Sequence, residues 1–380
     1  MTRRWSKASL LASVIALVAL AAQPVAAQSG AARQRTPSKS GNWTPPRTPW
    51  GDPDLQGTWS TDAAISIPLQ RPAQFAGRAT LTDEEFNQKA EQLKARHADA
   101  ERIKDGNIGE ISADALWQTT RAFRQTSLII EPADGQFPPF TPAAQATLGT
   151  IPRGTYGNGP LDGPEDFGMY DRCITRGVVG SVLPVVYGNG QRIVQGPGYV
   201  AFLNEMIHEH RIIPLDGRGH VDSKIRTYLG DSRGHWEGNT LVVETTNLRG
   251  NTTSIGLNGG NGGQAPRTSD ALRLVERFTR LEPDLLEWEV LVDDPDTYTR
   301  PIRIAVPLTS PPGYQVLAYD CHEGNKAVMQ ALGGERVEDR ALAEDLKKGI
   351  VRARKPVQNG LGVGGAPTES PSGAAGAGPR

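Results

Sequence analysis

The sequence predicts a mainly β protein, in which about eight antiparallel strands form a barrel or a sandwich behind an α-rich N-terminal extension. The first observation is a series of short segments, rich in β-branched and aromatic residues and bounded by turn formers. The second is that no helical pattern separates these segments, which favours an antiparallel sheet over a parallel one. The expected strands are 192–195, 199–213, 225–229, 240–246, 272–280, 285–292, 302–307 and 314–321.

The chain begins with a segment typical of a cleaved signal peptide, residues 1–27. Basic residues precede an apolar run at 8–22, which at about 15 residues is short for a membrane span. Val25 and Ala27 are small residues of the kind that signal peptidase requires. The Arg3–Arg4 pair leaves twin-arginine export open as an alternative route. Either route predicts a periplasmic or secreted protein without a retained membrane segment.

A polar segment and an α-rich extension are expected between the signal peptide and the β domain. Residues 28–53 are rich in Pro, Ser and Gly and are expected to form a linker or a strap on the domain. Docking is expected from Trp50 onward, because large aromatic side chains are rarely left in solvent. The extension proper is expected to cover residues 54–170.

Two helices are expected within this extension. The clearer one is 81–103, where Thr82 and Glu85 have the spacing of a capping box and good helix formers follow. The second is expected at about 113–124, and a short strand is expected to follow it.

The β domain is expected to cover residues 171–345. Inside it, residues 251–267 are rich in Gly and Asn and are expected to form a long loop. The final segment, 355–380, consists largely of Gly, Ala, Pro and Ser and is predicted to be disordered. No internal repeat is evident, so one β domain with an extension accounts for the chain.

Charge and cysteine content narrow the range of partners. The chain has 41 basic and 42 acidic residues, a net charge of -1, which argues against a nucleic-acid surface and leaves a small molecule as the expected ligand. Cys173 and Cys321 are the whole cysteine content, and in an oxidising compartment they are predicted to form a disulfide. A reactive thiol and a metal ligand are the alternatives. The motifs for dinucleotides and phosphate loops are absent, so no cofactor is expected.

The most informative polar segment is Gly230–Glu244, which contains ionisable side chains at alternate positions and then continues into an expected strand. An extended backbone would project the alternating side chains to one side, where they could converge on a ligand. A solvated hairpin turn is the structural alternative. The alternating residues are Asp231, Arg233, His235 and Glu237.

Acid–base catalysis most often uses a histidine, and a nearby cation can stabilise the negative charge that develops. The candidate base is His235 or His208, and the candidate stabilising cation is Arg211 or Arg233. Asp231 completes the set of candidate catalytic residues.

Two segments resemble metal sites in part. His208 and His210 lie two residues apart on an expected strand, a spacing that places both rings on one face. The chain has no HExxH motif and no Cys/His cluster, so a polar strand edge is the favoured interpretation. Asp293, Asp294 and Asp296 have the composition of a calcium loop but lack its glycine, which favours an Asp-Pro turn. No metal site is predicted.

A second polar segment, 319–325, ends the last expected strand. A disulfide between Cys173 and Cys321 would bring the residues around Asp171 to this segment. Polar side chains near this corner, and one beyond the Asp-Pro turn, are candidates for substrate binding. The candidates are Arg172, Tyr298, Tyr319 and His322.

Several motifs, taken as a set, are similar to those of a large family of secreted bacterial proteins without an established activity. They are WGDPDLQGTW at 50–59, GDSRGHWEGNTLVVET at 230–245, VERFTR at 275–280 and CHEGN at 321–325, and the resemblance covers about 50–336. The resemblance implies export and a shared fold. The family pattern has no second histidine where His210 stands, which further weakens the metal interpretation.

Three classes of function stay open. The first is a metal-independent acid–base enzyme, a lyase, isomerase or hydrolase, that acts on an apolar or aromatic small molecule. The second is a lipocalin-like carrier whose barrel holds an apolar ligand, and the third is a structural protein of the envelope. The enzyme hypothesis requires that side chains such as His208, His235, His322 and Arg211 point into one pocket.

Overall fold

The computed structural model describes residues 43–103, 121–147, 161–167, 169–185, 188–250 and 268–354. All of these residues belong to one compact unit. The expected signal peptide, the first part of the strap, most of the second expected helix, the Gly-rich loop and the C-terminal tail lie outside the described residues. None of the helices in the described part combines the length and the apolar character that crossing a bilayer requires.

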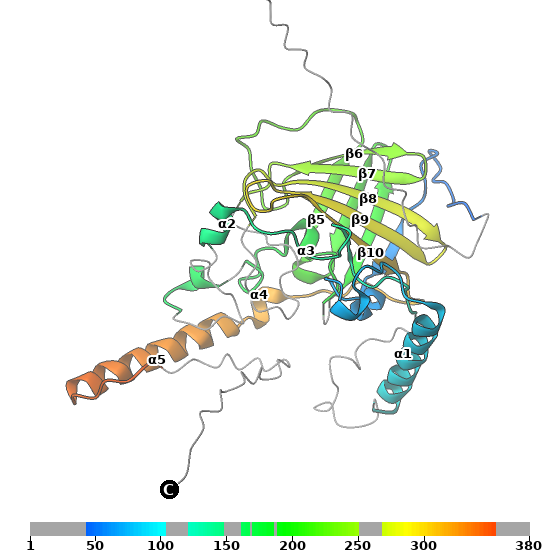
Figure 1. The fold of residues 1–380 in the computed structure, drawn as a ribbon. Helices are drawn as coiled ribbons and strands as arrows, with labels where there is room; N and C mark the ends of the chain where they lie inside the picture. Colours follow the sequence, from blue (N-terminus) through cyan, green and yellow to red (C-terminus); the bar gives the residue numbers. More distant parts are fainter. Residues whose placement is uncertain are drawn as a thin grey trace, which may run out of the picture. The chain divides into compact units, whose positions relative to one another are not determined.

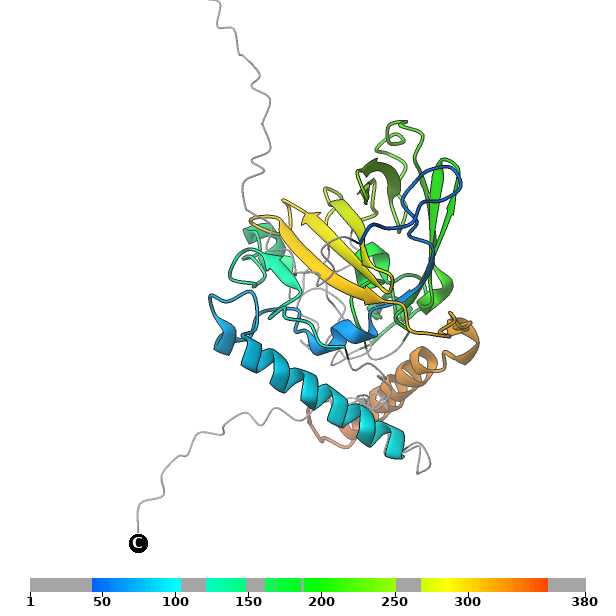
Figure 2. The same cartoon turned by 90° about the vertical axis from the view of Figure 1, so that its right-hand side faces the viewer.

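A 10-stranded antiparallel sheet dominates the fold and curls into a nearly closed barrel (Figure 1, Figure 2). Neighbouring strands follow the order β5-β4-β3-β1-β10-β9-β8-β7-β6, and β2 pairs with β10 off this path. The predicted mainly β, antiparallel fold is therefore confirmed. The strands are β1 (Gly57–Ser60), β2 (Ile129–Glu131), β3 (Gly190–Gly196), β4 (Tyr199–Asn204), β5 (His210–Pro214), β6 (Asp231–Glu237), β7 (Thr240–Thr246), β8 (Arg273–Glu282), β9 (Leu285–Asp293) and β10 (Ile302–Thr309).

Strands β5 and β6 are the two ends of this order, and side chains fill the seam between them. A Cβ atom added at Gly234 of β6 would lie 2.9 Å from Ile213 Cγ2 and 2.7 Å from Leu215 Cδ2. Both distances are under 3.0 Å, which real Cβ atoms essentially never show. Glycine at this position therefore allows β6 to approach β5 closely enough to bring the barrel near closure.

Large side chains fill the interior of the barrel. Because side chains alternate along a strand, β8 and β9 send Phe278 and Trp288 inward, where both are fully buried. Phe202 of β4 packs on Phe278 with ring centroids 4.5 Å apart. A buried ion pair lies in the same interior: the Arg211 guanidinium donates to both carboxylate oxygens of Glu276 at 2.7 and 2.9 Å. The Trp288 indole donates to Glu276 Oε1 at 3.0 Å, so the pair is held within the core.

The expected strand 199–213 is instead a hairpin of two strands, β4 and β5. The break is the 3-10 turn η8 (Met206–His208), where Ile207 and His208 have φ angles of 63° and 55°. Residues other than glycine rarely adopt this left-handed conformation, so strand propensity does not reveal the break. His208 and His210 consequently do not share the face of one strand.

Two other expected strands are absent from the described sheet, and one expected turn is a strand. Residues 225–229 lie in a loop with a single isolated bridge, between Thr227 and Leu248. Arg226 donates to the Leu248 carbonyl at 3.1 Å and ties this loop to the same segment. Residues 314–321 are irregular up to Cys321, where helix α4 begins. Asp231–Glu237, expected as a possible turn, is strand β6.

Helix α1 (Asp83–Ile103) confirms the clearer of the two expected helices. Its capping box is formed: the Glu85 N–H donates to Thr82 Oγ1 at 3.2 Å, and the Thr82 N–H donates to Glu85 Oε2 at 2.8 Å. Helix α5 (Ala327–Lys347) was not expected from the sequence. The remaining helices are η1 (Asp62–Ser66), η2 (Ala73–Phe75), α2 (Pro142–Thr147), η7 (Pro164–Asp166), α3 (Gly177–Gly180) and α4 (Cys321–Gly324).

The described part of the strap contacts the barrel earlier than Trp50. The Arg280 guanidinium carbon lies 5.9 Å from the centre of the Trp43 ring and 5.3 Å from that of the Trp59 ring. Arg47 donates to the Asn239 side chain at 2.9 Å, at the turn between β6 and β7. A cation between aromatic rings and a side-chain hydrogen bond therefore hold the strap in place.

Candidate functional site

Strand β6 projects its charged side chains outward. Ser232 and Gly234 are buried toward the interior, so the alternate residues Asp231, Arg233 and His235 lie on the outer face of the barrel wall. The sequence expectation that these residues share one side of an extended backbone agrees with this geometry.

A histidine from the preceding loop joins this face. His220 Nδ1 lies 2.8 Å from Asp231 Oδ2, and Arg233 donates to both oxygens of the same carboxylate at 3.2 and 3.0 Å. The Val221 N–H adds a fourth hydrogen bond to Asp231, at 3.2 Å. The side chains of His220, Asp231 and Arg233 are 24%, 18% and 19% exposed, so the cluster is largely shielded but open to solvent on one side.

The loop that carries His220 is held at both ends. At its start, Asp216 accepts from the Arg218 backbone N–H at 3.1 Å and from its guanidinium at 2.7 Å, which closes a tight turn. Beyond His220, the Asn247 side chain donates to the carbonyls of Val221 and Asp222 at 3.1 and 3.0 Å. These hydrogen bonds fix the backbone that carries the His220 side chain.

The electrostatics of the cluster favour an ionised carboxylate. Burial raises the pKa of Asp231, but hydrogen bonds from His220, the Val221 N–H and Arg233 outweigh burial and hold that pKa below its usual range. The Arg218 guanidinium likewise lowers the pKa of Asp216. The outer face of β6 therefore presents the ionised Asp231 carboxylate beside His220 and Arg233.

This geometry equips His220 for proton transfer. A contact between Nδ1 and a carboxylate places the proton of the neutral ring on Nδ1, which leaves Nε2 with a lone pair. No described residue is hydrogen bonded to Nε2. When Nε2 accepts a proton, Asp231 stabilises the imidazolium, and Arg233 keeps the carboxylate ionised.

His235, a candidate base from the sequence, is placed less favourably than His220. Its side chain is 63% exposed, and Nε2 lies 3.4 Å from Glu237 Oε1. Arg277 of β8 donates to the other oxygen of Glu237 at 2.7 Å and is the main reason that the pKa of Glu237 is lowered. His235 thus belongs to a solvated row of charges along β6 and β8.

Arg211 is separated from these residues by the barrel wall. Its side chain is 6% exposed and is bound inside the barrel to Glu276. Arg211 and His235 therefore lie on opposite faces of the wall and do not meet in one pocket. Sequence alone could not pair Arg211 with a carboxylate 65 positions away.

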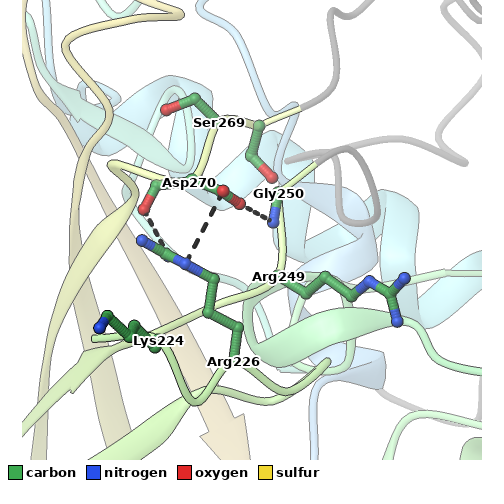
Figure 3. Close-up of a pocket in the computed structure, with 7 residues that line it drawn as sticks. Lys224, Arg226, Arg249, Gly250, Ser269 and Asp270 are labelled. Atoms are coloured by element: carbon green, nitrogen blue, oxygen red, sulfur yellow. Dashed lines mark hydrogen bonds and ion pairs between the residues drawn. The ribbon is translucent and has the colours of Figure 1, made fainter. Parts of the chain in front are cut away.

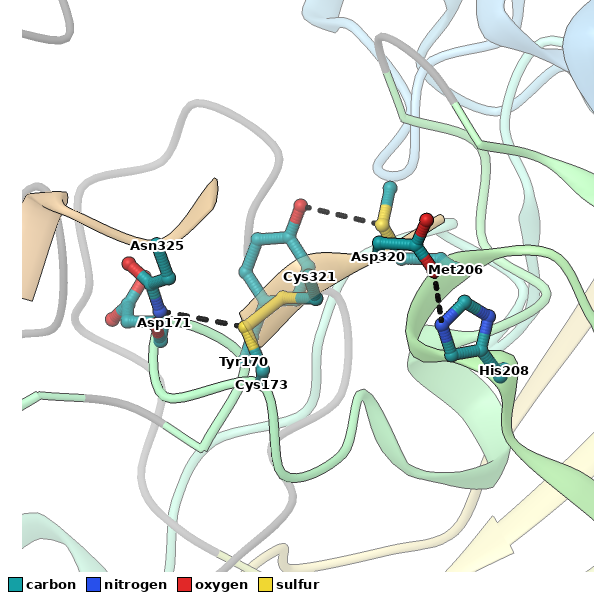
Figure 4. Close-up of a disulfide and its surroundings, with 8 residues drawn as sticks. All are labelled: Tyr170, Asp171, Cys173, Met206, His208, Asp320, Cys321 and Asn325. Atoms are coloured by element: carbon teal, nitrogen blue, oxygen red, sulfur yellow. Dashed lines mark hydrogen bonds and ion pairs between the residues drawn. A yellow bond between two sulfur atoms is a disulfide. The ribbon is translucent and has the colours of Figure 1, made fainter. Parts of the chain in front are cut away.

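All but one of the remaining candidates lie at a third place, the corner formed by the disulfide (Figure 4). The predicted bond between Cys173 and Cys321 is present, with Cα atoms 5.8 Å apart. His208 Nε2 lies 3.8 Å from Asp320 Oδ1, next to Cys321, and both side chains are about half exposed or more, at 48% and 67%. Asn325 donates to the Asp171 carbonyl at 2.6 Å and braces the corner.

Three candidate substrate-binding residues flank this disulfide. The Arg172 guanidinium contacts Met169 Sδ at 3.1 Å, and His322 is exposed on α4. Tyr319 precedes the same helix and is half-buried. The fourth candidate, Tyr298, lies elsewhere: it packs between Phe137 and Phe140, and burial raises its pKa.

A hollow of about 690 Å³ opens at the far end of the His220 loop (Figure 3). Three segments line it: the loop at Lys224 and Arg226, the segment after β7 at Arg249, and the segment before β8 at Ser269 and Asp270. No group of three or more His, Cys, Asp or Glu side chains in the described ranges is arranged to hold a metal ion.

Sequence reasoning missed two residues that the structure brings forward. His220 is not among the candidate site residues predicted from the sequence, although it follows a turn-forming run that begins at Asp216 and precedes the strand that begins with Asp231. Glu276 sits at an inward position of a regular strand, where a lone carboxylate requires a buried partner.

Comparisons with protein-family models, with curated proteins and with solved structures found no match for this chain.

Proposed function

We propose that the chain is a periplasmic or secreted β-barrel protein that binds a small molecule, and that His220, Asp231 and Arg233 perform acid–base chemistry on it. The observation that carries the proposal is the 2.8 Å contact between His220 Nδ1 and Asp231 Oδ2 in a shielded cluster whose ring remains 24% exposed. A positioned histidine beside an ionised carboxylate is an arrangement that supports general base catalysis.

The proposed reaction is a proton transfer without a metal, as in a lyase, isomerase or hydrolase. His220 Nε2 takes a proton from a C–H or O–H group of the ligand and becomes an imidazolium, which Asp231 stabilises. The imidazolium then returns the proton to the product or to water. Arg233 carries the positive charge that keeps Asp231 ionised throughout.

In this proposal the barrel carries the site on its outer wall and does not enclose the ligand. A barrel of this size has an interior that side chains fill or that holds one small ligand. Here Trp288, Phe278 and the Arg211–Glu276 pair occupy the interior, which favours a site on the wall over a lipocalin-like central site. Export is supported by the N-terminal pattern and by the disulfide, because disulfides persist in oxidising compartments.

The proposal is tested by metabolite analysis of a strain that lacks the protein. Wild-type protein is expected to restore the metabolite profile of the parent strain, and His220→Gln is expected not to. His235→Gln is the matched control, because this histidine also stands beside a carboxylate but is 63% exposed. Restoration of the profile by His220→Gln would contradict the catalytic role.

A second test needs no substrate. Nitrogen-15 NMR of the imidazole rings is expected to show neutral His220 with its proton on Nδ1, and Asp231→Asn is expected to remove this preference. Neutral imidazoles in water favour the tautomer with the proton on Nε2, so the exposed ring of His235 provides an internal reference. A His220 ring protonated on Nε2 would contradict the proposed base.

A further inference from the structure

We propose that the outward face of strands β3, β4 and β5 docks the barrel on the surface of an anionic lipid bilayer. The proposal goes beyond the proposed function and does not depend on it. Three observations support it: exposed apolar side chains lie side by side on this face, basic residues border them, and none of the outward residues of these strands is acidic.

The register of the three strands places their outward residues in rows. In the central row, Val194 of β3 pairs with Ala201 of β4, which pairs in turn with Ile212 of β5. Val194 and Ile212 are 42% and 63% exposed. Side chains paired across neighbouring strands lie about 5 Å apart, so these residues form one continuous apolar strip and are not scattered over the surface.

Tyr199 extends this strip toward the turn between β3 and β4. Its ring lies over Gly196, because a Cβ atom added to this glycine would collide with Cε1 and Cζ of the ring. Glycine at this position therefore allows the ring to lie against β3. Tyr199 is still 43% exposed and pairs with Pro214 of β5. Tyrosine has the apolar ring and polar tip that are typical of side chains at a membrane–water interface.

The opposite edge of the face is basic. Arg192 of β3 and His210 of β5 are exposed and lie in one row, on either side of Leu203. An apolar centre with a basic edge and without carboxylates is complementary to a bilayer that carries anionic headgroups. The outward residues are Arg192, Val194 and Gly196 in β3, Tyr199, Ala201 and Leu203 in β4, and His210, Ile212 and Pro214 in β5.

The other side of the barrel wall has a different character. On β6 to β10, outward residues of opposite charge lie next to each other and form ion pairs. Arg277 contacts Glu237 at 2.7 Å, and Arg303 contacts Glu289 at 2.8 Å. Removing such charges from water costs free energy, so this side of the wall favours solvent. The face of β3 to β5 is therefore the side of the wall that suits a bilayer.

The shape and size of the face favour a bilayer over a second copy of the chain. The sheet curls into a nearly closed barrel, so its outer face is convex, and two convex faces touch over a small area (Figure 2). With strands about 4.8 Å apart and residues about 3.3 Å apart, the face spans roughly 15 Å by 17 Å, or about 250 Å². Each partner in a stable protein interface buries about 800 Å². A fluid bilayer surface, in contrast, adapts to a convex face.

The experiment is co-sedimentation of the full mature chain with two kinds of vesicle, phosphatidylcholine with added phosphatidylglycerol and phosphatidylcholine alone. Binding is expected to the anionic vesicles and is expected to weaken as salt screens the headgroups. Ile212→Gln removes an apolar side chain and Arg192→Gln removes a charge, and each is expected to weaken partitioning about fivefold. Arg192→Lys keeps the charge and is expected to retain most of the binding.

Val337→Gln is the matched control, because Val337 is 57% exposed but lies on helix α5. It is expected to bind vesicles as wild type does. The exchanged side chains are exposed, so urea denaturation is expected to show that all variants remain folded. The proposal is overturned if wild type does not bind the anionic vesicles, or if Val337→Gln weakens binding as much as Ile212→Gln does.

Sedimentation velocity without vesicles tests the competing occupant, a second copy of the chain. Wild type is expected to sediment as a monomer. A dimer that Ile212→Gln dissociates would overturn the docking on a bilayer and would identify the face as an interface between copies.

This proposal and the proposed function fail separately. His220 is not part of the face, so His220→Gln is expected to bind anionic vesicles as wild type does. Loss of vesicle binding in Ile212→Gln together with a normal metabolite profile in His220→Gln would reject the acid–base role and leave the docking face standing.

Discussion

At the scale of single residues, Asp231 is the side chain on which the candidate site depends. Its pKa lies below the usual range, so the ionised carboxylate stabilises the fold above about pH 4, and this stabilisation is lost as the pH falls through the folded pKa. Asp231→Asn is expected to lower the free energy of unfolding by about 1 kcal/mol at neutral pH and by much less in acid. Urea denaturation at neutral and acidic pH measures both values.

The control for this prediction is Glu323→Gln, which removes a carboxylate from the exposed helix α4. It is expected to change the unfolding free energy only slightly, because exposed charges contribute little. A loss in Asp231→Asn that is equal at both pH values would show that the carboxylate is not held by His220 and Arg233.

Glu276 is the second residue whose charge matters, because it is fully buried with Arg211. Glu276→Gln keeps an acceptor for the Trp288 indole but leaves the guanidinium without a counter-charge, which is expected to cost about 3 kcal/mol or more. The double variant Arg211→Met/Glu276→Leu removes both charges and is expected to recover most of this loss. Urea denaturation followed by tryptophan fluorescence separates the three proteins, and equal stability of the single and double variants would contradict the buried pair.

At the scale of elements, Gly234 controls how closely β6 approaches β5. A valine there would press on Ile213 and Leu215, so Gly234→Val is expected to destabilise the protein by about 2 kcal/mol through overpacking. The control is Gly219→Val in the His220 loop, where an added Cβ has no neighbour within 4 Å and φ is not left-handed. Amide exchange is expected to speed up along β5 and β6 in Gly234→Val, and unchanged exchange there would mean that the seam does not depend on glycine.

The elements show where sequence patterns succeed and where they fail. Strands β7 to β10 were predictable because β-branched residues alternate there and turns bound each run. The break at η8 was not, because Ile207 and His208 adopt a left-handed backbone that local propensity does not encode. Helix α5 contains Gly333 and Gly334 in its middle, which obscures an otherwise helical composition.

At the scale of the whole molecule, the candidate site could be predicted only in part. That the Asp231 and Arg233 side chains point outward follows from the alternation of side chains along a strand, which is a local rule. Two contacts depend instead on which segments become neighbours, and this is set by packing across the barrel. They are the contact of Arg211 with Glu276 inside the barrel and the contact of His220 with Asp231 outside it. Local patterns therefore supplied Asp231 and Arg233, but neither His220 nor the grouping of the three residues.

The disulfide encloses most of the barrel, because it joins Cys173, which lies before β3, to Cys321, which lies after β10. The cysteines are 148 residues apart, so in the chain-entropy model the bond stabilises the fold by about 5 kcal/mol through the unfolded state. The double variant Cys173→Ser/Cys321→Ser is expected to lose an amount of that order in urea denaturation, and wild type in reductant is expected to match it. The His220 ring signals are expected to persist in the folded double variant, because the disulfide corner and the β6 cluster are separate. A double variant as stable as the oxidised wild type would show that the barrel alone restrains the ends of the chain.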